Sequence, residues 1–132
     1  MIEYKLSLRS VPTNISEVEP FVEKIKDELN IGDEVYGNIL ITLTEAVNNS
    51  ILHGNQGDEN LEVEINCTGT DKLVSFVITD HGTGFDYNNL PDPTDPENLH
   101  KLTGRGVFLM KQLSDLLIFS NSGSKVELQF KL

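Results

Sequence analysis

Residues 43–54 form the most informative segment of the chain and read Leu43-Thr44-Glu45-Ala46-Val47-Asn48-Asn49-Ser50-Ile51-Leu52-His53-Gly54. Apolar residues at helical spacing run from upstream into this segment and predict an amphipathic helix from Asp33 to Gly54. Glu45, Asn49 and His53 follow at steps of four, so they share one face of that helix. Asparagine in the middle of a helix is not explained by local propensity. The polar face is therefore either a solvated surface or a functional site.

The segments around this helix alternate in a way that predicts strands. Residues 2–9 place Ile2, Tyr4, Leu6 and Leu8 on one face. Alternation also predicts strands over 61–67 and 126–132. Residues 73–79 are nearly all β-formers with little alternation, which predicts a more central strand, and a further strand is predicted over 116–120. Further helices are predicted over 16–30 and 107–113. In the helix over 16–30, Ser16 and Glu19 have the form of a capping box. Strands and helices without regular alternation predict an α+β fold, a two-layer sandwich of a mixed, mostly antiparallel sheet with helices on one face.

Length and charge restrict the class of protein. The chain has 132 residues, which at roughly 150 residues per domain predicts a single domain over 1–132. Its formal charge of −11 disfavours nucleic acid as a direct partner, because phosphate binding needs clustered Lys and Arg. The one cysteine, Cys67, excludes an internal disulfide and favours a reducing compartment. Without a signal peptide or an apolar run long enough to span a bilayer, a cytoplasmic protein with no membrane partner is expected.

Two further segments contain residues that the helix and strand patterns of the rest of the chain do not explain. In Asp80-His81-Gly82-Thr83-Gly84-Phe85 a carboxylate at a strand end is followed by two glycines, which let backbone approach a ligand closely. The alternative is an ordinary glycine turn capped by Asp80. In Thr103-Gly104-Arg105-Gly106 a glycine loop opens the last predicted helix, an arrangement suited to an anion, to which Arg105 adds a guanidinium group. Each of these signals is weak when taken alone.

The segment between these two motifs is rich in Pro, Asn and Asp over residues 86–100. Loops of more than about 12 residues inside a compact domain are usually functional or mobile. A Gly-x-x-x-x-Gly-Lys-Ser/Thr sequence is absent from the chain. A P-loop is thereby excluded as the means of holding phosphates.

The three motifs occur in one order, Glu45-x-x-x-Asn49, then Asp80-x-Gly82-x-Gly84, then Gly104-x-Gly106. In this the chain resembles the GHKL superfamily of ATP-binding domains, also called the Bergerat fold, over nearly its whole length. Residues 43–54, together with residues 92–99 and 104–110, resemble the stand-alone anti-sigma factor serine/threonine kinases of that superfamily.

The resemblance implies a role for each matching residue. Asp80 would bind the adenine amine, and Gly82 and Gly84 would shape the adenine pocket. Asn49 would ligate Mg²⁺ on the triphosphate of ATP, and Glu45 would be the catalytic base. Residues 86–103 would form a lid over the nucleotide. The remaining nucleotide contacts would come from Thr103, Gly104, Arg105, Gly106 and Val107.

Two functions of this fold remain open at this point, beside a third hypothesis of an unrelated α+β interaction domain with chance glycines. The first is an ATP-dependent serine/threonine kinase that sequesters a sigma factor and phosphorylates an anti-sigma factor antagonist. The second is an ATP-gated binding switch of the same fold with little or no kinase activity. The presence of Glu45 favours catalysis, because a pure binder needs no base. The branch that the chain resembles usually forms homodimers through the sheet. This makes Tyr4, Leu6, Leu8 or their neighbours candidates for the dimer interface, called the seam below.

Overall fold

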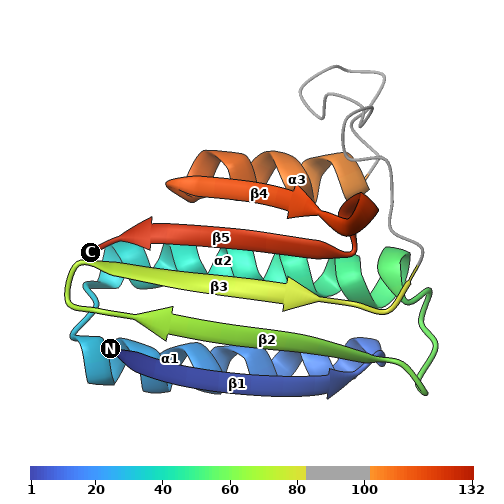
Figure 1. The fold of residues 1–132 in the computed structure, drawn as a ribbon, viewed down its shortest axis with the longest axis horizontal. Helices are drawn as coiled ribbons and strands as arrows, with labels where there is room; N and C mark the ends of the chain where they lie inside the picture. The colour runs from blue at the N-terminus through green and yellow to red at the C-terminus, as the bar shows by residue number, and fades with distance from the viewer. Residues whose placement is uncertain (83–101) are drawn as a thin grey trace.

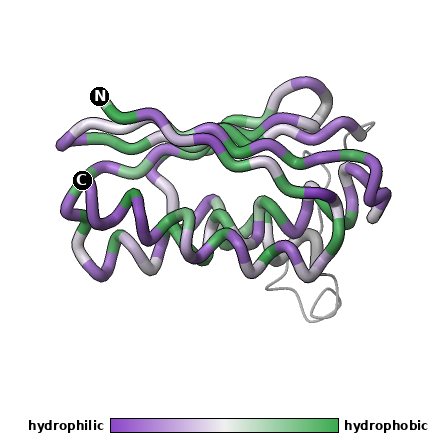
Figure 2. The backbone as a smooth tube through the Cα atoms, turned by 90° about the horizontal axis from the view of Figure 1, so that it is seen from below, coloured by the Kyte–Doolittle hydropathy of each residue, from purple (hydrophilic) through white to green (hydrophobic). Residues whose placement is uncertain are grey.

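The computed structural model describes residues 1–82 and 102–132. In that part of the chain, five strands form one antiparallel sheet in the order β1-β2-β3-β5-β4. Its strands are β1 (Ile2–Arg9), β2 (Glu62–Gly69), β3 (Leu73–Thr79), β4 (Leu116–Ser120) and β5 (Lys125–Lys131). Helices α1 (Val18–Leu29), α2 (Asp33–Asn49) and α3 (Leu102–Leu113) lie behind the sheet in Figure 1. The predicted α+β sandwich is confirmed, and Figure 2 shows the sheet and the helices as two separate layers.

Strand β2 has one buried and one more exposed face, as its alternation predicts, and β3 has the same division although its sequence shows little alternation. In β2 and β3 alternate residues are buried while their neighbours stay at least partly exposed. The buried faces of β2, β3 and β5 pack against α1 and α2, and Phe76 meets Phe130 edge to face at 6.1 Å between ring centroids. Burial raises the pKa of the Cys67 thiol to about 12, so this thiol stays protonated and inert at neutral pH.

Strand β1 forms one edge of the sheet and pairs with β2 from Ile2 opposite Gly69 to Arg9 opposite Glu62. Leu8 is buried in the core, whereas Tyr4 and Leu6 are only partly buried.

No helix in residues 1–82 and 102–132 combines the length and apolar character needed to cross a membrane.

The helix ends differ from the sequence predictions. The capping box at Ser16 is wrong, because residues Pro12–Glu17 form a 3₁₀ turn and the Ser16 hydroxyl donates to the Thr13 carbonyl at 2.9 Å. Proline fixes φ in the range that such a turn needs, and this allows the turn to precede α1. The last helix begins at Leu102 instead of residue 107, so the glycines at 104 and 106 lie in its first turns. Packing of α3 against α2 overrides a propensity penalty of about 1 kcal/mol per glycine.

Helix α2 contains a glycine, Gly37, that serves no close approach among the described residues. A Cβ atom added there would meet nothing within 4 Å. We expect Gly37→Ala to raise the free energy of unfolding by about 0.5–1 kcal/mol, because alanine loses less backbone entropy in a helix. Urea denaturation measures this change, and a lower midpoint in the variant would contradict it.

Candidate functional site

The first cluster of the candidate site joins α2 to α3. Glu45 is half-buried and Asn49 lies one helical turn further on with 6% of its surface exposed. A Cβ atom added at Gly106 of α3 would lie 2.8 Å from Glu45 Oε2 and 3.4 Å from Asn49 Nδ2. The absence of a side chain at Gly106 therefore lets the backbone of α3 approach both polar groups. The structure brings the first and third sequence motifs together at this point.

The side chain of Asn49 has a buried hydrogen-bond donor that is unsatisfied among the described residues. Its Nδ2 is buried and has no hydrogen-bond partner among the described residues. A buried donor left unpaired costs about 1–3 kcal/mol, so such atoms in native proteins call for an explanation. A ligand that accepts a hydrogen bond beside Glu45 and Gly106 would remove this cost. The side chain therefore suits a site that is completed by a bound polar group.

The second cluster surrounds Asp80, which directly follows β3 and is 5% exposed. Its Oδ1 accepts a hydrogen bond from the Gly82 amide at 3.0 Å, and the Ser50 hydroxyl also hydrogen-bonds the carboxylate. Burial raises the pKa of Asp80, while the bonds from Gly82 and Ser50 and the charge of His81 oppose that rise. The result is a buried carboxylate held in a fixed orientation at a strand end.

A π-helical turn, η2 (Ser50–Gly54), links the two clusters. It continues α2 directly after Asn49, and the Asn55 amide donates to the Ser50 carbonyl at 2.8 Å. Single π-helical turns associated with α-helices are often found at functional sites. Because Asn49 belongs to the first cluster and the adjacent Ser50 contacts Asp80, both clusters form one continuous site. His53 lies within this π-turn, and its side chain is exposed.

The π-turn also places backbone against backbone. A Cβ atom added at Gly54 would lie 2.5 Å from Asp80 Cγ, and one added at Gly82 would overlap the Gly54 carbonyl group. Both glycines are thus required by close approach between the end of η2 and the turn after β3. A hollow of about 330 Å³ opens beside them, lined by Gly54, Asn55, Gln56, Asp58, Leu61, His81 and Gly82.

Sequence reasoning missed two residues that the structure places at the site, Ser50 and Asn55. Ser50 contacts the Asp80 carboxylate, and Asn55 is 2% exposed and accepts a hydrogen bond from the His81 amide at 2.8 Å. An asparagine after His-Gly at a helix end is typical of any turn, so its sequence context gives no signal of this contact. Gly54 gives a stronger signal, since a glycine at that place already suggested a helix end.

Part of the predicted site falls outside the described residues. Gly84 and the predicted lid up to residue 101 lie there. The backbone of Thr103, Gly104 and Arg105 belongs to the first turns of α3, but their side chains are outside what the structure describes. Val107 is buried at 2% exposure on the same helix.

Comparison with known proteins finds similarity over most of the chain. The family described as the histidine kinase-like ATPase domain matches residues 8–130. An anti-sigma F factor of Clostridium perfringens is 28% identical over 130 residues, which cover 93% of this chain and 84% of that protein. An anti-sigma F factor of Clostridium botulinum is 27% identical over 119 residues, covering 88% and 75%. A serine-protein kinase RsbW of Listeria monocytogenes is 23% identical over 116 residues, covering 83% and 74%.

Proposed function

The chain belongs to the histidine kinase-like ATPase domain family, and from this premise we propose that it is an ATP-dependent protein kinase that also acts as an anti-sigma factor. Its protein substrate would be an anti-sigma factor antagonist, phosphorylated on serine or threonine, and its second partner a sigma factor. One observation supports this most. The π-turn that follows Glu45 and Asn49 begins at Ser50, whose hydroxyl hydrogen-bonds the buried carboxylate of Asp80. The names of the similar anti-sigma F factors and RsbW kinases support the choice of partners.

The adenine base would bind at the Asp80 cluster. Oδ1 of Asp80 is already engaged by the Gly82 amide, and the rest of the buried carboxylate can accept a hydrogen bond from an exocyclic amine. Gly54 and Gly82 let the backbone pack closely around Asp80, and the hollow of about 330 Å³ beside them offers the space for a flat ring. Gly84 would complete the pocket.

The triphosphate would extend from Asp80 toward α3. The first amides of a helix attract anions, and Gly104 and Gly106 allow close approach to the α3 backbone. Thr103, Arg105 and Val107 would add further contacts to the nucleotide. Asn49 fits Mg²⁺, because its amide oxygen is a suitable hard ligand and its unpaired Nδ2 can donate to a phosphate oxygen. Bound Mg²⁺ would neutralise charge on the phosphates.

Glu45 would act as the catalytic base. The partner's hydroxyl oxygen forms a bond to the γ-phosphorus, the bond to the ADP oxygen breaks, and the hydroxyl proton passes to the Glu45 carboxylate. Phosphoryl transfer depends mainly on positioning and charge neutralisation. A half-buried carboxylate next to Gly106 has the access to a phosphate-binding segment that this role requires.

The charge of the chain agrees with the proposed partners. At −11 it would attract a partner with a basic face, as DNA-binding factors have, and speed the encounter. We place the seam of a homodimer at β1, which is an edge strand. Because Leu8 is buried in the core, Tyr4 and Leu6 are the better candidates for contacts across that seam.

The direct test is phosphate transfer. The purified protein, Mg²⁺ and γ-labelled ATP are incubated with the small antagonist-like proteins of the same cell. Label on a serine or threonine of one of them is the expected result. If nucleotide binds and none of these proteins is labelled, the chain is an ATP-gated binding switch and the kinase assignment is wrong. If adenine nucleotide does not bind at all, both assignments fail.

Replacing the buried carboxylate tests the adenine contact. In Asp80→Asn an amide group replaces the acceptor that would face the exocyclic amine, and hydrogen bonds to charged groups contribute about 1.5–3 kcal/mol. We expect ATP affinity to fall by about 10- to 100-fold, measured by isothermal titration calorimetry. Unchanged affinity would contradict the placement of adenine at Asp80.

The same substitution has a second expected effect, on stability. Because burial raises the pKa of Asp80 above its unfolded value, the ionised carboxylate lowers stability above the raised pKa, and this penalty disappears as pH falls below the unfolded value. At pH 7.5 the melting temperature of Asp80→Asn is therefore expected to equal or exceed that of the wild type. A clear drop would show that the carboxylate mainly stabilises the fold.

A further inference from the structure

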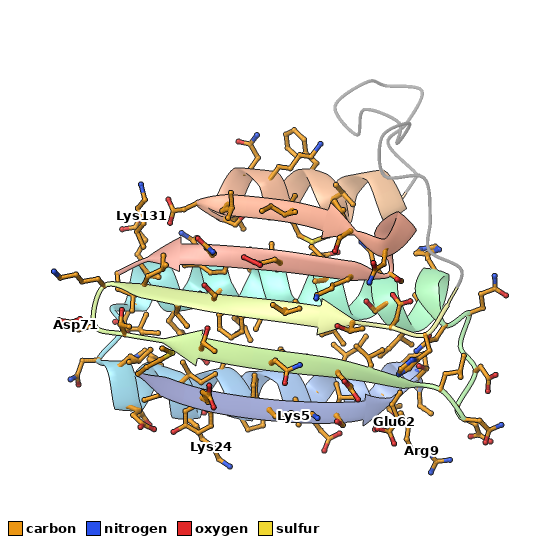
Figure 3. All side chains as sticks on the ribbon, in the orientation of Figure 1. Lys5, Arg9, Lys24, Glu62, Asp71 and Lys131 are labelled. Carbon is orange, nitrogen blue, oxygen red and sulfur yellow. The ribbon has the colours of Figure 1, made fainter. Side chains whose placement is uncertain are left out.

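Asn55 occupies a junction between three segments that are distant in sequence. Its side chain is buried, and its Nδ2 donates to Ser10 Oγ at 2.8 Å and to the Glu62 carbonyl at 3.2 Å. Its Oδ1 accepts from the His81 amide at 2.8 Å. Ser10 follows β1, Glu62 begins β2 and His81 follows β3, so one side chain joins three strand ends. Figure 3 shows this end of the sheet, where Arg9 and Glu62 are labelled.

The turn after β3 is fixed by its three successive amides. The Asp80 amide donates to the Ser124 carbonyl at 2.9 Å, and the Gly82 amide donates to the carboxylate of Asp80 itself. The amide between them, that of His81, donates to Asn55. Of these three hydrogen bonds, only the one to Asn55 connects the turn to the β1–β2 side of the sheet.

We propose that Asn55 is a positioning residue that holds the turn of residues 80–82 so that the Asp80 carboxylate meets the exocyclic amine of adenine. The inference rests on the proposed function, because it assigns Asn55 to the same nucleotide site. Asn55 acts through the His81 amide and does not itself touch the nucleotide. Ser10 supports it, since its hydroxyl donates to the Leu61 carbonyl at 2.7 Å and accepts from Asn55.

The loss of this side chain has a specific consequence. Without Asn55 the His81 amide loses its partner, and the turn loses its bond to the β1–β2 side of the sheet while the bonds at Asp80 and Gly82 remain. The carboxylate would then lose its alignment with the amine, although its charge and burial remain. Such a change reduces recognition of the amine more than it reduces binding of the triphosphate, which is held elsewhere.

The experiment compares ATP with inosine triphosphate, which lacks the exocyclic amine. The wild type is expected to bind ATP at least about tenfold more tightly, the effect of about one hydrogen bond to a charged group. In Asn55→Ala we expect ATP affinity to fall about tenfold and the preference for ATP to shrink toward one, with inosine triphosphate affected much less. Both affinities are measured by calorimetry on the full chain, well below the melting temperature.

The matched control is Val63→Ala, which removes buried side-chain volume from β2 without touching the turn. It is expected to lower stability while keeping the wild-type preference for ATP. If Asn55→Ala also keeps that preference, or both variants lose it equally, the inference is overturned. If Asn55→Ala does not fold, Ser10→Ala takes its place and is expected to show a smaller reduction of the preference, and an unchanged preference would overturn the inference. A wild type that binds neither nucleotide refutes the proposed function instead.

Discussion

Glu45→Gln is expected to reduce the rate of phosphate transfer to the antagonist protein by about 10²–10⁴-fold, the usual contribution of a general base. The substitution preserves shape but removes the group that would accept the hydroxyl proton. ATP affinity is expected to change little, because the adenine contacts lie at Asp80 and the proposed phosphate contacts at α3. Single-turnover transfer of labelled phosphate measures the rate, and calorimetry measures the affinity separately.

Glu34→Gln is the matched control for this experiment. Glu34 is exposed in the first turn of the same helix, α2, and lies far along it from the site. The control is expected to transfer phosphate at the wild-type rate. Transfer by Glu45→Gln at the control rate would show that this carboxylate is not the base. Loss of ATP affinity in Glu45→Gln would instead assign Glu45 to nucleotide binding.

The sheet could be predicted from the sequence because each strand buries one face. Alternation of period two identifies β1, and runs of β-forming residues identify β3 and β4. These three strands begin and end where the sequence predicts. Helix ends were harder to predict. The glycines at 104 and 106 suggested a loop, yet close packing of α3 on α2 keeps them helical, and this depends on contacts that a local pattern does not contain.

The candidate site was predictable as a set of residues but not as a geometry. Glu45, Asn49, Asp80 and Gly82 were identified from motif order. The π-turn that joins them leaves no recognisable pattern, because it depends on a bond from the Asn55 amide to the Ser50 carbonyl. The contacts of Gly54 with Asp80 and Gly82 span more than 25 residues of sequence and form only when the sheet is assembled. Asn55 was missed for the same reason.

The second large effect is expected from Gly82→Ala. The added Cβ atom would overlap the carbonyl group of Gly54, which is backbone and cannot move away as a flexible side chain could. Overpacking of this kind costs about 1–3 kcal/mol of stability. The turn must shift, and Asp80 shifts with it because its carboxylate is bonded to the Gly82 amide. We expect ATP affinity to fall by about 100-fold or more, since both the amine contact and the shape of the pocket are lost.

Gly37→Ala provides the internal comparison, because it is the same chemical change at a glycine with open space around its Cα. The two variants should differ in sign: Gly37→Ala gains stability and keeps ATP affinity, whereas Gly82→Ala loses both. Urea denaturation and calorimetry on the two proteins measure this contrast. If Gly82→Ala binds ATP as tightly as the wild type, the close approach to Gly54 does not shape the pocket. The adenine would then have to lie away from the turn after β3, where Asp80 could not reach it.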